Sequence, residues 1–280
     1  MLIAAMVLLS LAGCDGAASP AVEATPSASP SPSAAAARPG VGMCHTGQSM
    51  SVYDYKAVTL NAVDCAESHQ AEIIRVGQLT SPPENKTPEV YADCDTTARE
   101  YVGGDWHEGR LGLAIVVPST DEWLKGAREY RCALFEFAAD GFTSKARTGT
   151  LKDGLRGPRP LALSCMDVLG VPDAQGWYQE ITRLVPIDCG QPHNGEFVGL
   201  YTGTATTIPD MNKLIREVTQ SCNGKAAAFL GQSESKFAAR TDVRVYPTGG
   251  NQEWWALGDR TTRCYILTAP DHRMTKSLKA

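Results

Sequence analysis

The sequence has no block of basic residues. Its 26 Lys and Arg residues are outnumbered by 31 Asp and Glu residues, and the net charge is −5. A nucleic-acid-binding domain carries a basic patch or stripe, so this charge pattern argues against nucleic acid as a partner. After residue 13 the chain also lacks any long apolar run. A transmembrane helix needs about 20 apolar residues, so none is predicted in the remainder of the chain.

Signatures of common enzyme classes are missing as well. The chain contains no G-x-S-x-G nucleophile motif and no phosphate-binding P-loop. Residues 233–236 read SESK and match S-x-x-K, but the S-D-N and K-T-G motifs that accompany it in the penicillin-binding enzymes are absent. We therefore predict no motif-based nucleophilic catalysis, no cofactor and no resident metal.

The first residues predict export. Residues 1–13 form a short apolar run, although the basic residues that usually precede such a run are missing. The run ends in Leu-Ala-Gly-Cys14, which resembles a bacterial lipobox. That resemblance implies a lipoprotein signal peptide over residues 1–14 with lipid attached to Cys14, and a plain signal peptide is the alternative. We expect a protein anchored by lipid to the outer face of the cytoplasmic membrane.

The next segment predicts a spacer. Residues 15–42 are rich in Ala, Ser and Pro and contain almost no large apolar side chains. Such a composition cannot bury enough surface to offset its chain entropy, so it predicts a disordered tether.

Nine cysteines are present, which is an odd number for an exported protein. If Cys14 carries lipid, eight remain in two sets of four: Cys44, Cys65, Cys94 and Cys132, then Cys165, Cys189, Cys222 and Cys264. An even, repeated set in an oxidising compartment predicts disulfides. Each set allows three pairings. We favour the first cysteine with the fourth and the second with the third, because this would join the outer strands and tie the helix to the sheet.

A repeated signature organises the chain. Residues 65–72 read CAESHQAE and residues 189–196 read CGQPHNGE, and both match C-x3-H-x2-E. Two further patterns recur: C-x6-[YF]-x-G from Cys94 and Cys222, and W-x2-G-x-R-x3-C from Trp123 and Trp255. Repetition of this kind predicts two copies of one module. We place the modules at residues 43–152 and 161–280, with a Gly- and Pro-rich linker at residues 153–160.

Each module is predicted to be β-β-β-α-β-β, an α+β fold with one helix on a face of a small, mainly antiparallel sheet. Proline predicts that the first helix begins near residues 87–89, and two glycines end it at residues 103–104. The second helix is predicted at residues 209–231. Runs of β-branched residues predict nine of these strands, at residues 56–63, 71–79, 113–117, 129–138, 161–168, 177–187, 195–200, 243–246 and 262–268.

The paired signatures, the lipobox and the tether together resemble the actinobacterial septum-formation family of secreted proteins. The resemblance covers residues 44–280. It implies a link to cell-wall or division-septum formation and a cell-wall or division-protein partner. It supplies no catalytic residues.

Seven residues are candidates for binding: His69, Glu72, Arg128, His193, Glu196, Trp254 and Arg260. The histidine and glutamate of each signature could bind a metal or a ligand. We favour an internal role, in which the histidine bonds to the loop backbone while the glutamate faces solvent or pairs with an arginine.

The two arginines and the additional tryptophan are predicted to have separate roles. Arg128 is expected to pair with Glu72 and Arg260 with Glu196, because a guanidinium binds a carboxylate through two hydrogen bonds. A clamp for an anionic ligand is the alternative. Trp254 has no counterpart in the first module, so it is the best candidate for an exposed contact residue.

These observations favour a non-enzymatic binding or scaffolding protein of the cell envelope, because the repeated features are mostly cysteines, turn glycines and inward-facing aromatic residues. The alternative is a metal-dependent envelope hydrolase. It would require His69, Glu72, His193 and Glu196 to act together across the two modules.

Overall fold

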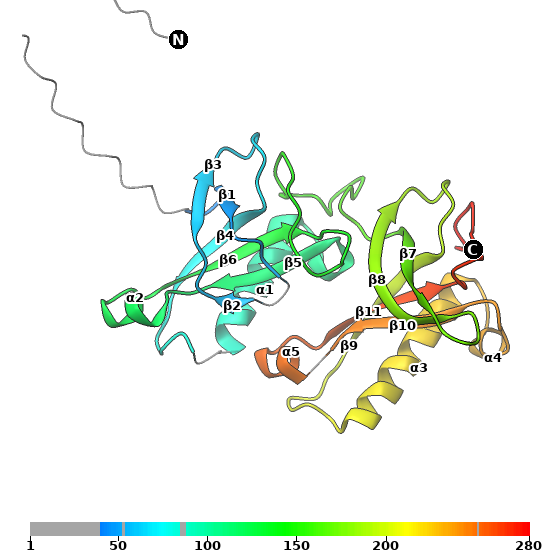
Figure 1. Cartoon of the computed structure of the whole chain (residues 1–280). Coiled ribbons are helices and arrows are strands. Elements are labelled where there is room, and N and C mark those ends of the chain that lie inside the picture. The colour runs from blue at the N-terminus through cyan, green and yellow to red at the C-terminus, as the bar shows by residue number, and fades with distance from the viewer. Residues whose placement is uncertain (1–39, 52–53, 85–87, 251) are drawn as a thin grey trace, which may run out of the picture. The chain divides into compact units, whose positions relative to one another are not determined.

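The structure, a computed structural model, describes residues 40–280 except 52–53, 85–87 and 251 (Figure 1). The predicted signal peptide, the lipidation site Cys14 and the tether up to residue 39 lie outside the described residues. In the described part of the chain, no helix is both long enough and apolar enough to cross a membrane. The described residues form two sheets with helices packed against them, an α+β architecture (Figure 1).

The first sheet has six strands in the order β2-β5-β6-β4-β1-β3. Its strands are β1 (Cys44–Gly47), β2 (Tyr55–Lys56), β3 (Leu60–Val63), β4 (Ala71–Gln78), β5 (Leu111–Val116) and β6 (Glu129–Glu136). Only β2 runs parallel to its neighbour, β5, and the other pairs are antiparallel.

This first sheet must curl. The predicted strand at residues 56–63 is in fact two strands, β2 and β3, which lie at opposite edges of the sheet. Five strand spacings in a flat sheet would separate these edges by about 24 Å. Residues 57–59 connect them, and so few residues can span only about 14 Å. The sheet therefore bends until its two edges approach each other.

The second sheet has five strands in the order β10-β11-β9-β7-β8, and all neighbours are antiparallel. Its strands are β7 (Cys165–Pro172), β8 (Tyr178–Ile187), β9 (Gly195–Thr202), β10 (Arg244–Gly249) and β11 (Thr261–Leu267). If β2 is set aside, both sheets place their five strands in the same spatial order relative to their order along the chain. β10 runs through Pro247, which its edge position permits because no hydrogen-bonding partner lies on its outer side.

One long helix packs on each sheet, as predicted. Helix α1 (Pro88–Val102) begins with a proline and ends at Gly103, whose positive φ of 75° suits a helix C-terminus. Helix α3 (Met211–Phe229) begins after Asp210, whose side chain accepts from Lys213 N. Each helix buries one stripe of small and apolar side chains that includes its cysteine, Cys94 or Cys222.

Short helices fill the connections. They are η1 (Trp106–Glu108), α2 (Thr120–Leu124), α4 (Glu234–Ala238) and α5 (Gln252–Leu257). Leu257 of α5 is buried in the core formed by α1 and the first sheet. We call the part of the chain that forms the first sheet (β1–β6) the first half, and the part that forms the second sheet (β7–β11) the second half. The two halves thus share apolar contacts around α1.

All eight predicted cysteines form disulfides, but the favoured pairing is wrong. The bonds are Cys44–Cys65, Cys94–Cys132, Cys165–Cys189 and Cys222–Cys264. β4 lies between β1 and β6, which places Cys44 and Cys132 two strand spacings apart. That separation is about 9–10 Å, beyond the roughly 7 Å between Cα atoms that a disulfide can bridge. β9 separates Cys165 from Cys264 in the same way.

Candidate functional site

The two C-x3-H-x2-E signatures form turns that lead into β4 and β9. His69 and His193 are fully buried. Each ring donates from Nδ1 to a backbone carbonyl two residues earlier, that of Glu67 at 2.9 Å or Gln191 at 2.8 Å. The bond makes Nδ1 a donor and fixes the orientation of each ring.

Both histidines also hold a distant segment through their backbones. His69 exchanges two backbone hydrogen bonds with Arg147, at 2.9 and 2.8 Å. His193 exchanges two with Met274, at 2.9 and 2.7 Å. Each partner lies in the chain after the last strand of its sheet. Each signature therefore docks the segment that follows β6 or β11.

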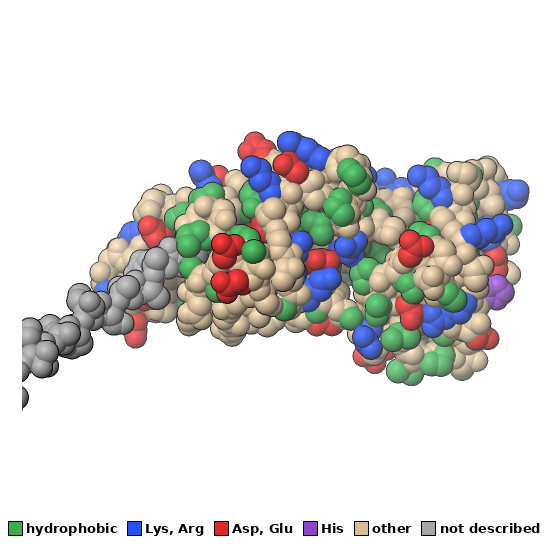
Figure 2. All heavy atoms as spheres, turned by 90° about the horizontal axis from the view of Figure 1, so that it is seen from above, with side chains coloured by type: hydrophobic (Ala, Val, Ile, Leu, Met, Phe, Trp, Pro, Cys, Tyr) green, Lys and Arg blue, Asp and Glu red, His purple; other side chains and the backbone are tan. Residues whose placement is uncertain are grey.

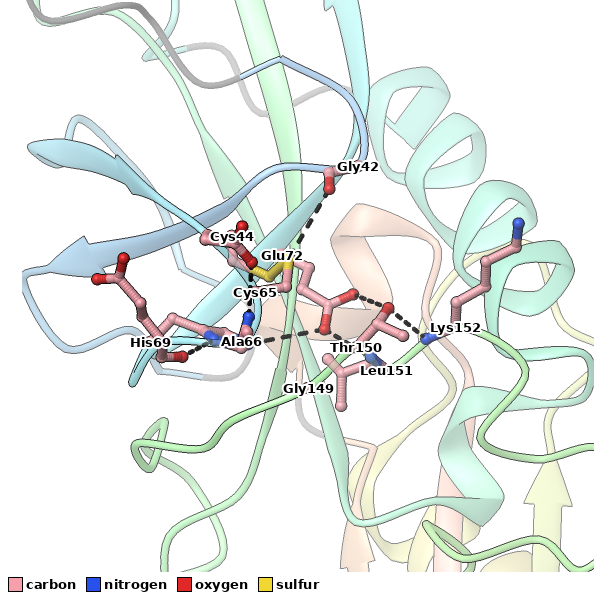
Figure 3. The surroundings of a disulfide bond; sticks show 12 residues. Gly42, Cys44, Cys65, Ala66, His69, Glu72, Gly149, Thr150, Leu151 and Lys152 are labelled. Carbon is pink, nitrogen blue, oxygen red and sulfur yellow. Dashed lines mark hydrogen bonds and ion pairs between the residues drawn. A yellow bond between two sulfur atoms is a disulfide. The ribbon is translucent and has the colours of Figure 1, made fainter.

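Glu72 completes this docking in the first half. Its carboxylate accepts hydrogen bonds from the backbone N–H of Leu151 at 2.5 Å and the hydroxyl of Thr150 at 3.0 Å (Figure 3). It also accepts from the hydroxyl of Tyr101 at 2.7 Å and from Arg147 Nη1 at 3.3 Å. Burial raises the pKa of Tyr101 to about 12, so its hydroxyl stays protonated and donates.

Glu196 makes the matching contacts in the second half. It accepts from the hydroxyl of Ser277 at 2.6 Å and the backbone N–H of Leu278 at 2.8 Å. We call each set a clasp: the first is His69, Glu72, Thr150 and Leu151, and the second is His193, Glu196, Ser277 and Leu278. Both glutamates are buried, so neither faces solvent; Glu72 instead pairs with an arginine, the other expected arrangement, although this arginine is Arg147.

The clasps do not suit a metal ion. In the described part of the chain, two groups have ligand atoms within 4.8 Å of one another: Cys44, His69 and Glu72, then Cys165, His193 and Glu196. The cysteines are bridged, which leaves one histidine and one carboxylate per group, whereas a catalytic zinc site normally has three protein ligands. Glu72 already accepts two bonds on each oxygen. The two groups are also separate, so the four residues do not form one joint site.

Arg128 and Arg260 do not pair with the glutamates, contrary to expectation. The guanidinium of Arg128 lies 3.7 Å from the ring centroid of Trp123 and donates to the carbonyls of Trp123 and Ala127. Arg260 lies 6.0 Å from the ring of Trp255 and donates to the carbonyl of Thr206. The W-x2-G-x-R pattern therefore encodes a local turn in which arginine covers the tryptophan. Arg147, which the sequence did not single out, pairs with Glu72 instead.

Trp254 is not a freely exposed contact residue. It is half-buried and packs against the core formed by α1 and the first sheet. Trp254 belongs to α5, which lies in sequence between β10 and β11 of the second sheet, yet its side chain contacts the core of the first half. The additional tryptophan of the second half therefore contributes to the contact between the two halves.

A family model described as septum formation matches residues 41–264, well over half of the 280 residues. The chain belongs to the septum formation family. No curated protein and no solved structure matches the chain. The match to the septum formation family includes all eight bridged cysteines, both signatures and both long helices.

A buried histidine in this family member links the two halves, and no sequence pattern had pointed to it. His107 of η1 lies between two carboxylates, with Nδ1 2.7 Å from Asp105 and Nε2 3.3 Å from Asp259. Burial lowers the pKa of His107, but hydrogen bonds to the two carboxylates outweigh burial and raise the pKa above its ordinary value. Arg263 of β11 donates to the carbonyl of His107 at 2.8 Å and so adds a second bond between the halves.

Proposed function

We propose that this protein is a lipid-anchored, extracytoplasmic envelope protein that acts as a non-enzymatic binding or scaffolding unit in cell-wall or division-septum formation. Membership of the septum formation family supports a role in division-septum formation. The lipobox-like sequence ending at Cys14 and the Ala/Ser/Pro-rich residues 15–42 support the anchor and the location.

We also propose that the chain arose from two tandem copies of one module, at residues 43–152 and 161–280. Three observations support this. The strand order matches once β2 is set aside, each half has one disulfide beside its signature and one between helix and sheet, and each half closes with a clasp. Residues 153–160 would then be the linker.

One observation favours a scaffold over an enzyme: the repeated polar residues make bonds within their own half. The two histidines donate to their own turns, the two glutamates accept from the closing segments, and the two arginines cover tryptophans. An enzyme needs activated side chains directed at a substrate. In this protein these histidines, glutamates and arginines already make contacts that stabilise the fold.

Cosedimentation with purified cell wall from the source organism tests the proposal. The full chain with intact disulfides should cosediment and should release no soluble wall fragments during long incubation. The matched control is the same protein after reduction and alkylation, which should lose binding because the fold is lost. Release of wall fragments by the intact protein would overturn the proposal that it is not an enzyme. A lack of cosedimentation would show that the cell wall is not its partner.

A further inference from the structure

The second sheet has a partly enclosed apolar cavity on the face opposite α3. Along β11, Cys264 and Ile266 face α3, whereas Arg263 and Tyr265 face the other side. Met166, Leu184 and Tyr265 line this cavity from the sheet. Its volume is about 50 Å³, several times the roughly 10–15 Å³ that one water molecule requires.

The other wall comes from outside the second sheet. Phe137 follows β6, and Trp254 belongs to α5, so segments far apart in the chain enclose the cavity. Phe142 also lines it and remains 55% exposed, which places an unburied aromatic ring beside the cavity. A small cavity with aliphatic and aromatic walls suits an unbranched hydrocarbon chain better than a bulky polar molecule.

Among the residues that the structure describes, two arginines and no carboxylates line this cavity. Arg263 as a residue is almost fully buried, and its guanidinium donates from Nε and Nη2 to the carbonyls of His107 and Leu111. It has no carboxylate within 4 Å in the described part of the chain, and its Nη1 donates to no group there. A buried cation with a spare donor on an apolar cavity favours an anionic ligand group.

The second arginine strengthens this electrostatic preference. Arg110 pairs with Glu136 at 3.3 Å, but the same carboxylate also contacts Lys145 at 2.8 Å and Arg147 at 3.4 Å. Three cations thus share one carboxylate, and Arg147 alone has a second one, Glu72. Positive charge therefore remains in excess beside the cavity. Over the face in Figure 2, in contrast, basic and acidic side chains are interspersed.

We propose that this cavity binds a single-chain anionic amphiphile, with the hydrocarbon chain between Leu184 and Phe137 and the acidic head at Arg263 and Arg110. A long-chain carboxylate and a long-chain phosphate monoester share this chemistry. The proposal rests on the cavity alone and does not depend on the envelope location or the scaffold role.

Calorimetric titration of the full chain with dodecanoate, below the concentration at which it forms micelles, tests the proposal. We expect saturable binding of one molecule per chain. Dodecanol and dodecylamine should bind at least about tenfold more weakly, because the neutral hydroxyl forms no ion pair with the guanidinium and the protonated amine is repelled by it. Tighter binding of dodecyl phosphate than of dodecanoate would support the proposal and identify phosphate as the head group.

Two variants and one control locate the site. Leu184→Trp fills the cavity from a half-buried strand position and should abolish binding, while Val171→Trp, on an exposed position of the same sheet, should leave it unchanged. Arg263→Gln should weaken dodecanoate about tenfold or more and leave the weak dodecanol binding unaltered. Equal binding of acid and alcohol, unchanged binding by the Leu184→Trp protein, or no saturation up to about 1 mM would overturn the proposal.

Discussion

The carboxylate of Glu72 accepts a hydrogen bond from the backbone N–H of Leu151, 79 residues later in the chain. Glu196 and Leu278 repeat this relationship with a separation of 82 residues. The second clasp has fewer donors, because Phe229 stands at the position in the repeat where Tyr101 donates to Glu72. In each half the repeated signature therefore holds the segment that follows the last strand. The first glutamate does so with more hydrogen bonds than the second.

Replacing these glutamates should destabilise the protein unequally. Glu72→Ala leaves a buried backbone N–H and two hydroxyls without their acceptor, and we expect it to lower the free energy of unfolding by about 3–5 kcal/mol. Glu196→Ala removes fewer bonds, and we expect a loss of about 2–3 kcal/mol. Urea unfolding with intact disulfides measures both.

Glu67→Ala is the matched control, because this carboxylate lies exposed in the same turn as the first clasp. Its free energy of unfolding should stay within about 0.5 kcal/mol of the parent value. Unchanged stability of the Glu72→Ala protein would contradict the role assigned to the first clasp.

The disulfides should differ in their resistance to reduction. Cys65 and Cys189 are half-buried, so the two bonds beside the signatures are reachable by a reductant in solution. The bonds between helix and sheet join fully buried cysteines. Brief mild reduction, alkylation and peptide mapping should label Cys44, Cys65, Cys165 and Cys189 first. Faster labelling of Cys94 or Cys222 would contradict this order, and unfolded protein, in which all four bonds should react alike, is the control.

The sequence predicted the two long helices well, because their signals are local, but it did not predict the short helices in the connections. Proline at the first helical position, glycine after the last, and apolar residues three or four apart define α1 without reference to the rest of the fold. The disulfide pairing could not be predicted in this way. It depends on which strands are neighbours, and β4 and β9 lie between the strands that the favoured pairing would have joined.

The contacts of the candidate site were equally hard to predict, since their partners are distant in sequence. Arg147 reaches Glu72 over 75 residues, and His107 reaches Asp259 over 152, with no shared spacing or repeat. Arg128 did lie in a repeated pattern, but its partner is the nearby Trp123. A repeated motif thus indicated a geometry that the two halves share and gave no information on the contacts between the halves.

Acid should destabilise the protein through His45. This histidine of β1 is fully buried, and neither ring nitrogen has a hydrogen-bond partner in the described part of the chain. Burial lowers its pKa to about 4; the backbone of Thr46 opposes this shift, and the nearby His69 adds a smaller lowering. The unfolded chain, with a pKa near 6.5, binds a proton that the folded chain does not, so stability is present above about pH 6.5 and falls as the pH drops toward 4. The loss should reach about 3 kcal/mol.

His45→Met tests this, because Met166 occupies the corresponding register position in β7. Methionine cannot bind a proton, so the variant should be more stable than the parent at about pH 4.5 and show a flatter dependence on pH. Urea unfolding at several pH values measures the difference. An equally steep loss of stability in the variant would assign the acid sensitivity to other groups.

Alkaline conditions should weaken the link between the halves through His107. The pKa of His107 is raised in the folded chain, because Asp105 and Asp259 outweigh burial. Its contribution is therefore complete below the unfolded value near 6.5 and is lost as the pH rises through the folded value. Arg99 and Arg263 also face this cluster, and their fixed charges do not titrate in that range.

The variant Asp259→Asn tests this, because it removes one of the two carboxylates. It should lower the free energy of unfolding by about 1–3 kcal/mol near pH 6 and by less near pH 9. Unfolding free energies across this range check the prediction, and a cost independent of pH would show that the contact does not depend on the protonated imidazole.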